Sequence, residues 1–236
     1  MAAIEFELDD GVAVLTMNDG ENRFNLPFLK AFLHALDQIE DTDARALVVT
    51  ASHEKIFSNG IDLDWLMPYI KKGDRDMATD FFYTMNRLFK RILLYPMPTI
   101  AAISGHAFAG GAIMSCAFDF RFMRSDRGFF CFPEVDLGIP FLPGMIALIS
   151  KAIPRYKMEE LHYTGKRATA EECEVHHIIT RACHIDDLMN EALSFAKGFN
   201  KRREVIAEMK QRMYLDIVHA FDIKDPPVIS SGMFYV

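Results

Sequence analysis

The stretch over residues 98–144 constrains the fold of this 236-residue chain more than any other part of the sequence. An apolar strand predicted over residues 99–103 meets a Ser104-Gly105 turn, and an apolar helix is predicted over residues 110–118. The small residues between turn and helix let a ligand approach the backbone N–H groups at the helix start, where an anion is stabilised. The pattern therefore predicts a strand–turn–helix unit with an anion or oxyanion site where the helix begins.

One carboxylate, Glu134, follows about twenty residues later in an otherwise apolar run. Backbone amides and a lone carboxylate suit proton transfer beside a carbonyl group, because the amides stabilise the oxyanion while the carboxylate moves the proton. The apolar neighbours Phe130, Phe132, Val135 and Ile139 would raise the pKa of this carboxyl group toward a useful range. The alternative is a surface glutamate that caps the end of a strand.

Strands alternate with helices along most of the chain, which favours an α/β fold with a mainly parallel sheet. A hairpin is predicted around residues 9–11, a turn over residues 55–60, and an irregular tail from Asp225 onward. Buried strands are expected over residues 46–50, 99–103, 120–124 and 129–132. Helices are expected over residues 27–40, 62–70, 74–95, 110–118, 143–153, 157–163, 169–174, 186–200 and 202–221.

Three segments resemble the crotonase family, also called the enoyl-CoA hydratase/isomerase superfamily. The sequence ISGHAFAGG at residues 103–111 resembles the second oxyanion-hole segment of that family, and IFSNGIDL at residues 56–63 resembles the first. The sequence PEVDLGI at residues 133–139 resembles the third conserved block of the family and is similar to the plant-type peroxisomal isomerases. The three segments match the family in order and separation, and the likeness extends over residues 4–192.

This resemblance implies the architecture of the whole chain. We expect a crotonase-like spiral of repeated ββα units over residues 1–192 and a helical C-terminal region over residues 193–236. The C-terminal region would contribute to trimerisation or contact coenzyme A. Homotrimers or hexamers are implied by the resemblance alone.

The resemblance also assigns an oxyanion hole by motif position. Its donors would be the backbone N–H groups of Ile61 and Gly110, with Gly60 and Gly111 in the substrate-binding segments. The loss of one such donor typically costs about 3 kcal/mol of transition-state stabilisation. The alternative is that these glycines serve only turns and packing.

Hydratases of the family carry two catalytic glutamates, and this chain retains only the second. Counting back from Asp119 places Ile113 at the first position, while Glu134 occupies the second. Hydration must position and activate a water, whereas moving a double bond from C3 to C2 needs one base and no water. The chain therefore resembles a Δ3,Δ2-enoyl-CoA isomerase in which Glu134 moves the proton and Ile113 helps to exclude water.

Two other functions remain open. Enoyl-CoA hydration or another thioester reaction such as hydrolysis would use Glu134 with Asp136 or water, since on a strand these two side chains would share a face. A non-catalytic acyl-CoA-binding protein is the alternative outside enzymes. Asp62 is expected to hold the Gly60 loop through backbone N–H groups, and His106 is expected to be structural.

Coenzyme A would enter as part of an acyl-CoA substrate, so no separate cofactor and no metal are expected. Arg23 and Phe24 fall near the adenine-pocket loop of the family, and Lys55 precedes the first oxyanion segment. For the two cations, solvated surface positions are the alternative. Trp65 would either line the acyl pocket or belong to the core.

Composition excludes some partners. The formal net charge of −7 argues against non-specific nucleic-acid binding, which needs a basic surface. No apolar run reaches the roughly 18 residues of a membrane span, and neither a secretory signal nor a Ser-Lys-Leu address is visible. The four cysteines form no Cys-x-x-Cys pair and are expected to be buried thiols. These patterns predict a cytoplasmic protein that contacts neither nucleic acid nor membrane.

Overall fold

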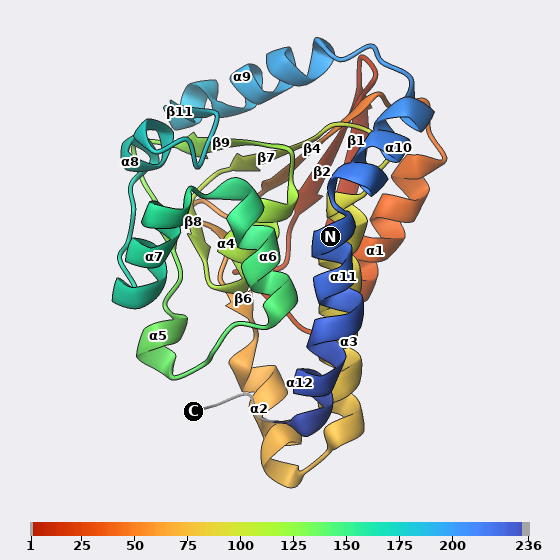
Figure 1. Cartoon of the computed structure of the whole chain (residues 1–236). Coiled ribbons are helices and arrows are strands. Elements are labelled where there is room, and N and C mark those ends of the chain that lie inside the picture. The colour runs from red at the N-terminus through yellow and green to blue at the C-terminus, as the bar shows by residue number, and fades with distance from the viewer. Residues whose placement is uncertain (1, 233–236) are drawn as a thin grey trace.

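The computed structural model describes residues 2–232 and is built around a six-stranded sheet (Figure 1). The order across this sheet is β1-β2-β4-β7-β9-β11. The strands are β1 (Ile4–Asp9), β2 (Val12–Met17), β4 (Ala46–Ala51), β7 (Thr99–Ile103), β9 (Phe120–Arg124) and β11 (Arg181–Cys183). The predicted hairpin is confirmed, because β1 and β2 are antiparallel. The other pairs of this sheet are parallel and need crossover connections, which the helices provide.

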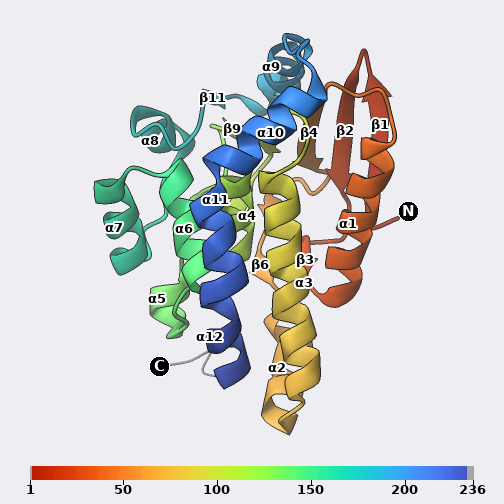
Figure 2. The same ribbon diagram turned by 45° about the vertical axis from the view of Figure 1, so that its right-hand side comes forward.

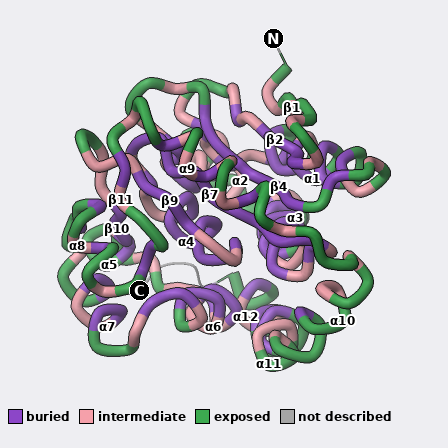
Figure 3. The backbone as a smooth tube through the Cα atoms, turned by 90° about the horizontal axis from the view of Figure 1, so that it is seen from above, coloured by how far each residue is buried: buried purple, intermediate pink, exposed green. Residues whose placement is uncertain are grey.

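Helices cover both faces of the sheet, so its inner strands are buried on both sides (Figure 3). On one face, Val48 and Ile100 share an apolar cluster with Leu188 of α9. On the other face, Val49 belongs to the larger core, which also contains residues of α1, α3 and α4. Burial on both faces explains the near-continuous apolar runs that predicted these strands. The helices concerned are α1 (Leu26–Glu40), α3 (Arg75–Leu93), α4 (Gly110–Ala117) and α9 (Ile185–Lys197).

Two smaller sheets carry the loops that were predicted to bind a ligand. One has the order β10-β8-β5 and the other pairs β3 with β6. The prediction of a turn over residues 55–60 is wrong, because this segment contains β5 and the start of β6. Ile56 pairs with His106, some fifty residues away, and such a distant partner leaves no local signal. The strands are β3 (Arg23–Phe24), β5 (Ile56–Ser58), β6 (Gly60–Ile61), β8 (His106–Phe108) and β10 (Phe130–Cys131).

The C-terminal region is helical and runs beside α3 (Figure 2). The expectation of an irregular tail is wrong for the described part, because residues 225–231 form α12, while residues 233–236 lie outside the described residues. Pro226 and Pro227 stand in the first turn of α12, the part of a helix that tolerates proline. The elements are α10 (Arg203–Met213), α11 (Leu215–His219), the π-helical η1 (Ala220–Lys224) and α12 (Asp225–Ser231).

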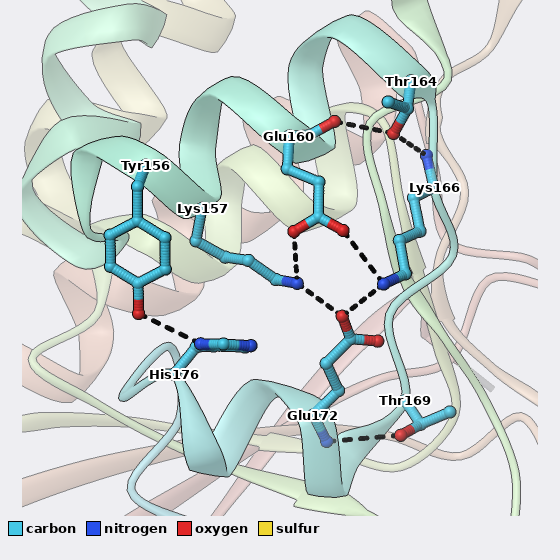
Figure 4. Close-up of polar contacts among 8 residues, drawn as sticks. All are labelled: Tyr156, Lys157, Glu160, Thr164, Lys166, Thr169, Glu172 and His176. Carbon is cyan, nitrogen blue, oxygen red and sulfur yellow. Dashed lines mark hydrogen bonds and ion pairs between the residues drawn. The ribbon is translucent and has the colours of Figure 1, made fainter.

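An ion-pair network ties α7 (Arg155–Thr164) to α8 (Ala170–Val175) (Figure 4). The buried ammonium of Lys157 contacts the carboxylates of Glu160 and Glu172, and Lys166 bridges the same two carboxylates. A buried charge is tolerated only when it is paired in this way. The network brackets the segment between the two helices, in which Ala168 exchanges backbone hydrogen bonds with Phe130 of β10.

The four cysteines are free and buried, as the sequence predicted. Among residues 2–232, no helix is long and apolar enough to cross a membrane. The same residues contain no group of three or more His, Cys, Asp and Glu side chains arranged to hold a metal ion.

Candidate active site

A cavity of about 390 Å³ lies where the small strands meet the surrounding helices. Its lining is almost entirely apolar, with Asn59 and Glu134 as the polar side chains. A cavity of this kind accepts an apolar ligand and offers a reacting group one carboxylate. Besides β6, α3, α4 and α12, the walls come from α2 (Leu63–Lys72), α5 (Glu134–Leu137) and α6 (Pro143–Ala152).

Gly60 of β6 and Gly110 of α4 bring two backbone segments into close contact beside this cavity. A Cβ atom on Gly60 would lie 2.4 Å from the Gly110 nitrogen, and Gly60 has a φ of +72°, so both space and conformation require glycine. The Asp62 N–H donates to the Phe24 carbonyl of β3 at 2.9 Å. Because successive N–H groups of a strand point to opposite edges, the Ile61 N–H points away from β3. Gly110 is the first residue of α4, so its N–H has no partner within the helix.

The structure therefore brings together the two residues that were predicted as oxyanion donors, since Ile61 and Gly110 both line the cavity. Ala109, the N-cap residue directly before Gly110, has a φ of +49° and a ψ of −125°, a conformation that strains an alanine. Strain of about 1–3 kcal/mol at one residue persists where the surroundings fix it, and it is found most often at functional sites. Here the Ala109 N–H is held by the Cys131 carbonyl at 3.0 Å.

Gly111 and Ser58 show how the two segments are held in register. A Cβ atom on Gly111 would lie 2.3 Å from the Ser58 carbonyl oxygen, so Gly111 allows α4 to pack against β5. The Ser58 hydroxyl donates to the Asn22 carbonyl at 2.7 Å and accepts from the Gly60 N–H at 3.1 Å. Gly111 thus serves the packing behind the cavity, and Ser58 and Asn22 are positioning residues that sequence reasoning missed.

Glu134 is buried at the wall of the cavity, with 7% of its surface exposed. Burial raises the pKa of its carboxyl group to about 7. Within residues 2–232 its Oε2 atom has no hydrogen-bond partner, so this oxygen is available to a ligand. The upward direction of the pKa shift agrees with the prediction from the apolar sequence around Glu134. Of the neighbours named there, Phe130 and Phe132 are fully buried, whereas Val135 is exposed.

Asp136 lies elsewhere. The prediction that it would share a face with Glu134 assumed a strand, but both residues belong to the short helix α5. Two residues along a helix point to roughly opposite sides, so Asp136 is exposed while Glu134 is buried. The Asp136 carboxylate lies against Gly165, where a Cβ atom would be 2.6 Å from its Oδ2.

The remaining residues from the sequence prediction divide between cavity and scaffold. Ile113 is buried and lines the cavity. Phe24 is fully buried behind Gly110 and packs on Phe28. This position differs from the expected one near the adenine pocket. Trp65 packs on the rings of Tyr69 and Phe81 at the edge of the core. This position agrees with the core alternative for Trp65.

Polar residues near the cavity mostly serve local structure. Arg23 pairs with the carboxylates of Glu21 and Asp64 at a half-exposed position. Asp62 accepts a backbone N–H, as expected, but it is the Trp65 N–H at 3.1 Å, so its carboxylate caps α2 instead of holding the Gly60 loop. His106 accepts the Phe129 N–H at 3.2 Å, and burial lowers the pKa of its imidazole, which fits a structural role.

Several cavity residues were not predicted as such. Their apolar periodicity indicates a buried helix face, but the sequence does not tell whether that face meets the core or a cavity. The unpredicted wall residues include Phe82 and Met85 of α3, Phe141, Met145 of α6 and Val228 of α12.

Comparison with known proteins identifies the family. A model of the enoyl-CoA hydratase/isomerase family matches residues 7–220. The chain is 30% identical to enoyl-CoA delta isomerase 3 of Arabidopsis thaliana over 237 residues, covering 94% of this chain and 96% of that protein. The chain therefore belongs to the enoyl-CoA hydratase/isomerase, or crotonase, superfamily of enzymes.

Solved structures show the same fold. A probable enoyl-CoA hydratase from Mycobacterium tuberculosis superimposes with a TM-score of 0.89 at 23% identity, covering 98% of this chain and 97% of the other. An enoyl-CoA hydratase/isomerase family protein from Pseudomonas syringae gives a TM-score of 0.85 at 25% identity, with 97% of each chain covered. The predicted crotonase-type α/β spiral with a helical C-terminal region is thus confirmed.

Proposed function

We propose that this enzyme is a Δ3,Δ2-enoyl-CoA isomerase. The observation that carries the proposal is the lining of the cavity, in which Glu134 is the one ionisable side chain among the described residues and Ile113 stands at the first glutamate position. Such a site offers one proton carrier in apolar surroundings. The similarity to an Arabidopsis thaliana protein named enoyl-CoA delta isomerase 3 supports the same reaction.

The reaction follows from the placement of these groups. Glu134 removes a proton from C2 of a 3-enoyl thioester, and the electron pair moves to give a dienolate. The N–H groups of Ile61 and Gly110 donate to the thioester oxygen, which gains negative charge in this step. Glu134 returns the proton at C4, which forms the conjugated 2-enoyl thioester, and the apolar wall around Ile113 limits attack by water.

Hydration is the second candidate, because a similar protein of Thermus thermophilus is named an enoyl-CoA hydratase. An ultraviolet thioester assay with 3-hexenoyl-CoA and 2-hexenoyl-CoA separates the two reactions. Isomerisation raises the absorbance of the conjugated enoyl thioester from the 3-enoyl substrate. Rapid loss of absorbance from the 2-enoyl substrate would identify a hydratase instead. Silence with both substrates, despite acyl-CoA binding, would favour other thioester chemistry or a non-catalytic binding protein.

The proposed base predicts a pH dependence. Only the ionised carboxylate of Glu134 can accept the C2 proton, so kcat/KM should rise about tenfold per pH unit below the pKa of about 7 and level off above it. Stopped assays with 3-hexenoyl-CoA between pH 5.5 and 9 measure this profile. Burial also raises the pKa of Asp225 to about 6, so this carboxyl group could be confused with Glu134 in the profile. The variant Asp225→Asn removes it and should keep the midpoint of the kcat/KM profile near pH 7. A profile that is flat or falls over this range would contradict Glu134 as the base.

Arg23 and Lys55 stay proposals as contacts to the coenzyme A portion. The cytoplasmic location stays a prediction from the sequence, and the trimer or hexamer stays an expectation from the family resemblance. Light scattering after gel filtration measures the assembly directly.

A further inference from the structure

The cavity extends along α2, away from the oxyanion segments. Leu63, Leu66 and Ile70 of α2 all line it, on successive turns of the helix. Leu63 comes two residues after Ile61, and a rise of 1.5 Å per residue puts Ile70 about 10 Å further along the helix axis. One end of the cavity therefore lies beside Ile61 and Gly110, and the other lies near the C-terminal half of α2.

The C-terminal helix α12 forms the wall at this far end. Val228 lines the main cavity. Its neighbour Ile229 lines a smaller cavity together with Ile70, so α12 lies against the C-terminal half of α2. Phe82 and Met85 of α3 complete the apolar surroundings. Val228 thus stands at the end of the cavity opposite the reacting groups.

Asp225 fixes α12 in this place. It is fully buried and accepts hydrogen bonds from the Gly144 N–H at 2.7 Å and from the Asn86 side-chain amide at 2.8 Å. Gly144 precedes the wall residue Met145 of α6, and Asn86 follows the wall residue Met85 of α3. One carboxylate therefore ties α12 to two other walls of the same cavity.

We infer that Val228 limits the length of the acyl chain and that Asp225 is the positioning residue that holds Val228 at the cavity end. The inference deepens the proposed function, since it takes the occupant to be the acyl part of an enoyl-CoA. An acyl chain whose reacting carbons lie at Glu134 reaches Val228 only when it is long enough to cross the cavity. A larger side chain at position 228 should exclude long chains and leave short ones in place.

The test compares kcat/KM for 3-hexenoyl-CoA and 3-dodecenoyl-CoA. Val228→Phe should lower the value for the twelve-carbon substrate at least tenfold and change the six-carbon value less than twofold, in keeping with the discrimination that apolar pockets achieve. Val228→Ala should shift the ratio toward the longer substrate. Ile223→Phe is the matched control, because Ile223 lies on the same C-terminal segment and is exposed. Equal changes for both substrates in Val228→Phe would overturn the inference.

Calorimetric binding of saturated hexanoyl-CoA and dodecanoyl-CoA separates this inference from the proposed function. If the variants shift chain-length preference in binding but the wild type isomerises nothing, the specificity role stands and the isomerase proposal fails. If the wild type isomerises and neither binding nor turnover depends on Val228, the isomerase stands and the specificity role fails. Asp225→Asn should blunt the chain-length preference, whereas a purely structural role would lower activity equally for both lengths.

Discussion

Replacing Glu134 by glutamine is expected to lower kcat for 3-hexenoyl-CoA by about 10³-fold, within the range that general acid–base groups contribute. Glutamine has nearly the same shape but cannot accept the C2 proton. Because the cavity and the amides of Ile61 and Gly110 stay in place, KM should change only a few-fold. Steady-state kinetics and calorimetric binding of hexanoyl-CoA measure the two effects separately.

The same substitution should make the folded protein more stable at alkaline pH. The folded-state pKa of about 7 lies above the ordinary value of 4.5, so the folded state holds this proton more tightly than the unfolded chain does. Wild-type stability from this group therefore falls as pH rises from 4.5 through 7. At pH 8 the difference between the two pKa values corresponds to a loss of about 3 kcal/mol in the free energy of unfolding. Glutamine should avoid this loss, because it places no charge in the cavity wall.

Urea unfolding of the wild type and of Glu134→Gln at pH 5 and pH 8 tests the direction of this stability change. The two should have similar free energies of unfolding at pH 5, and Glu134→Gln should be the more stable at pH 8. Asp136→Asn provides the comparison, because Asp136 is exposed on the same short helix. This variant should keep activity within about twofold and stability within about 0.5 kcal/mol. A large loss of turnover in Asp136→Asn would restore the two-carboxylate reading and weaken the isomerase proposal.

Much of the site could be predicted because its backbone lies in short contiguous segments. The glycines at positions 60 and 110 are required by a positive φ or a close approach of two chains, and such requirements are local enough to mark the sequence. The raised pKa of Glu134 was expected from its apolar neighbours, of which Phe130 and Phe132 are buried.

The failures have two physical causes, which are an element too short to show a period and dependence on distant partners. Asp136 was misplaced because α5 is too short to leave a periodic signal. The segment from Asp225 onward was expected to be irregular, yet residues 225–231 are helical, and the Asp225 carboxylate contacts the distant residues Gly144 and Asn86. Val228 became visible as a wall residue only once α12 was placed.

Gly60→Ala is expected to lower kcat by about 10²–10³-fold, the effect of losing one oxyanion donor. A Cβ atom at this position would lie 2.4 Å from the Gly110 nitrogen, so the two segments must move apart. That movement displaces the N–H groups of Ile61 and Gly110 from the position of the thioester oxygen. Since the φ of +72° also strains an alanine, the free energy of unfolding should fall by about 1 kcal/mol or more.

Gly20→Ala is a control that separates the effect of backbone strain from the effect of displacing the Ile61 and Gly110 N–H groups. Gly20 also has a positive φ, +52°, but no atom lies within 4 Å of the Cβ position. This variant should lose about 1 kcal/mol of stability through its backbone and keep nearly full turnover. Kinetics with 3-hexenoyl-CoA beside urea unfolding therefore distinguish two causes. If both variants lost activity in proportion to their stability, the contact between Gly60 and Gly110 would be structural, and the oxyanion hole would have to be sought elsewhere along the cavity. A loss of turnover confined to Gly60→Ala, at comparable stability, ties the rate to the separation of these two backbone segments.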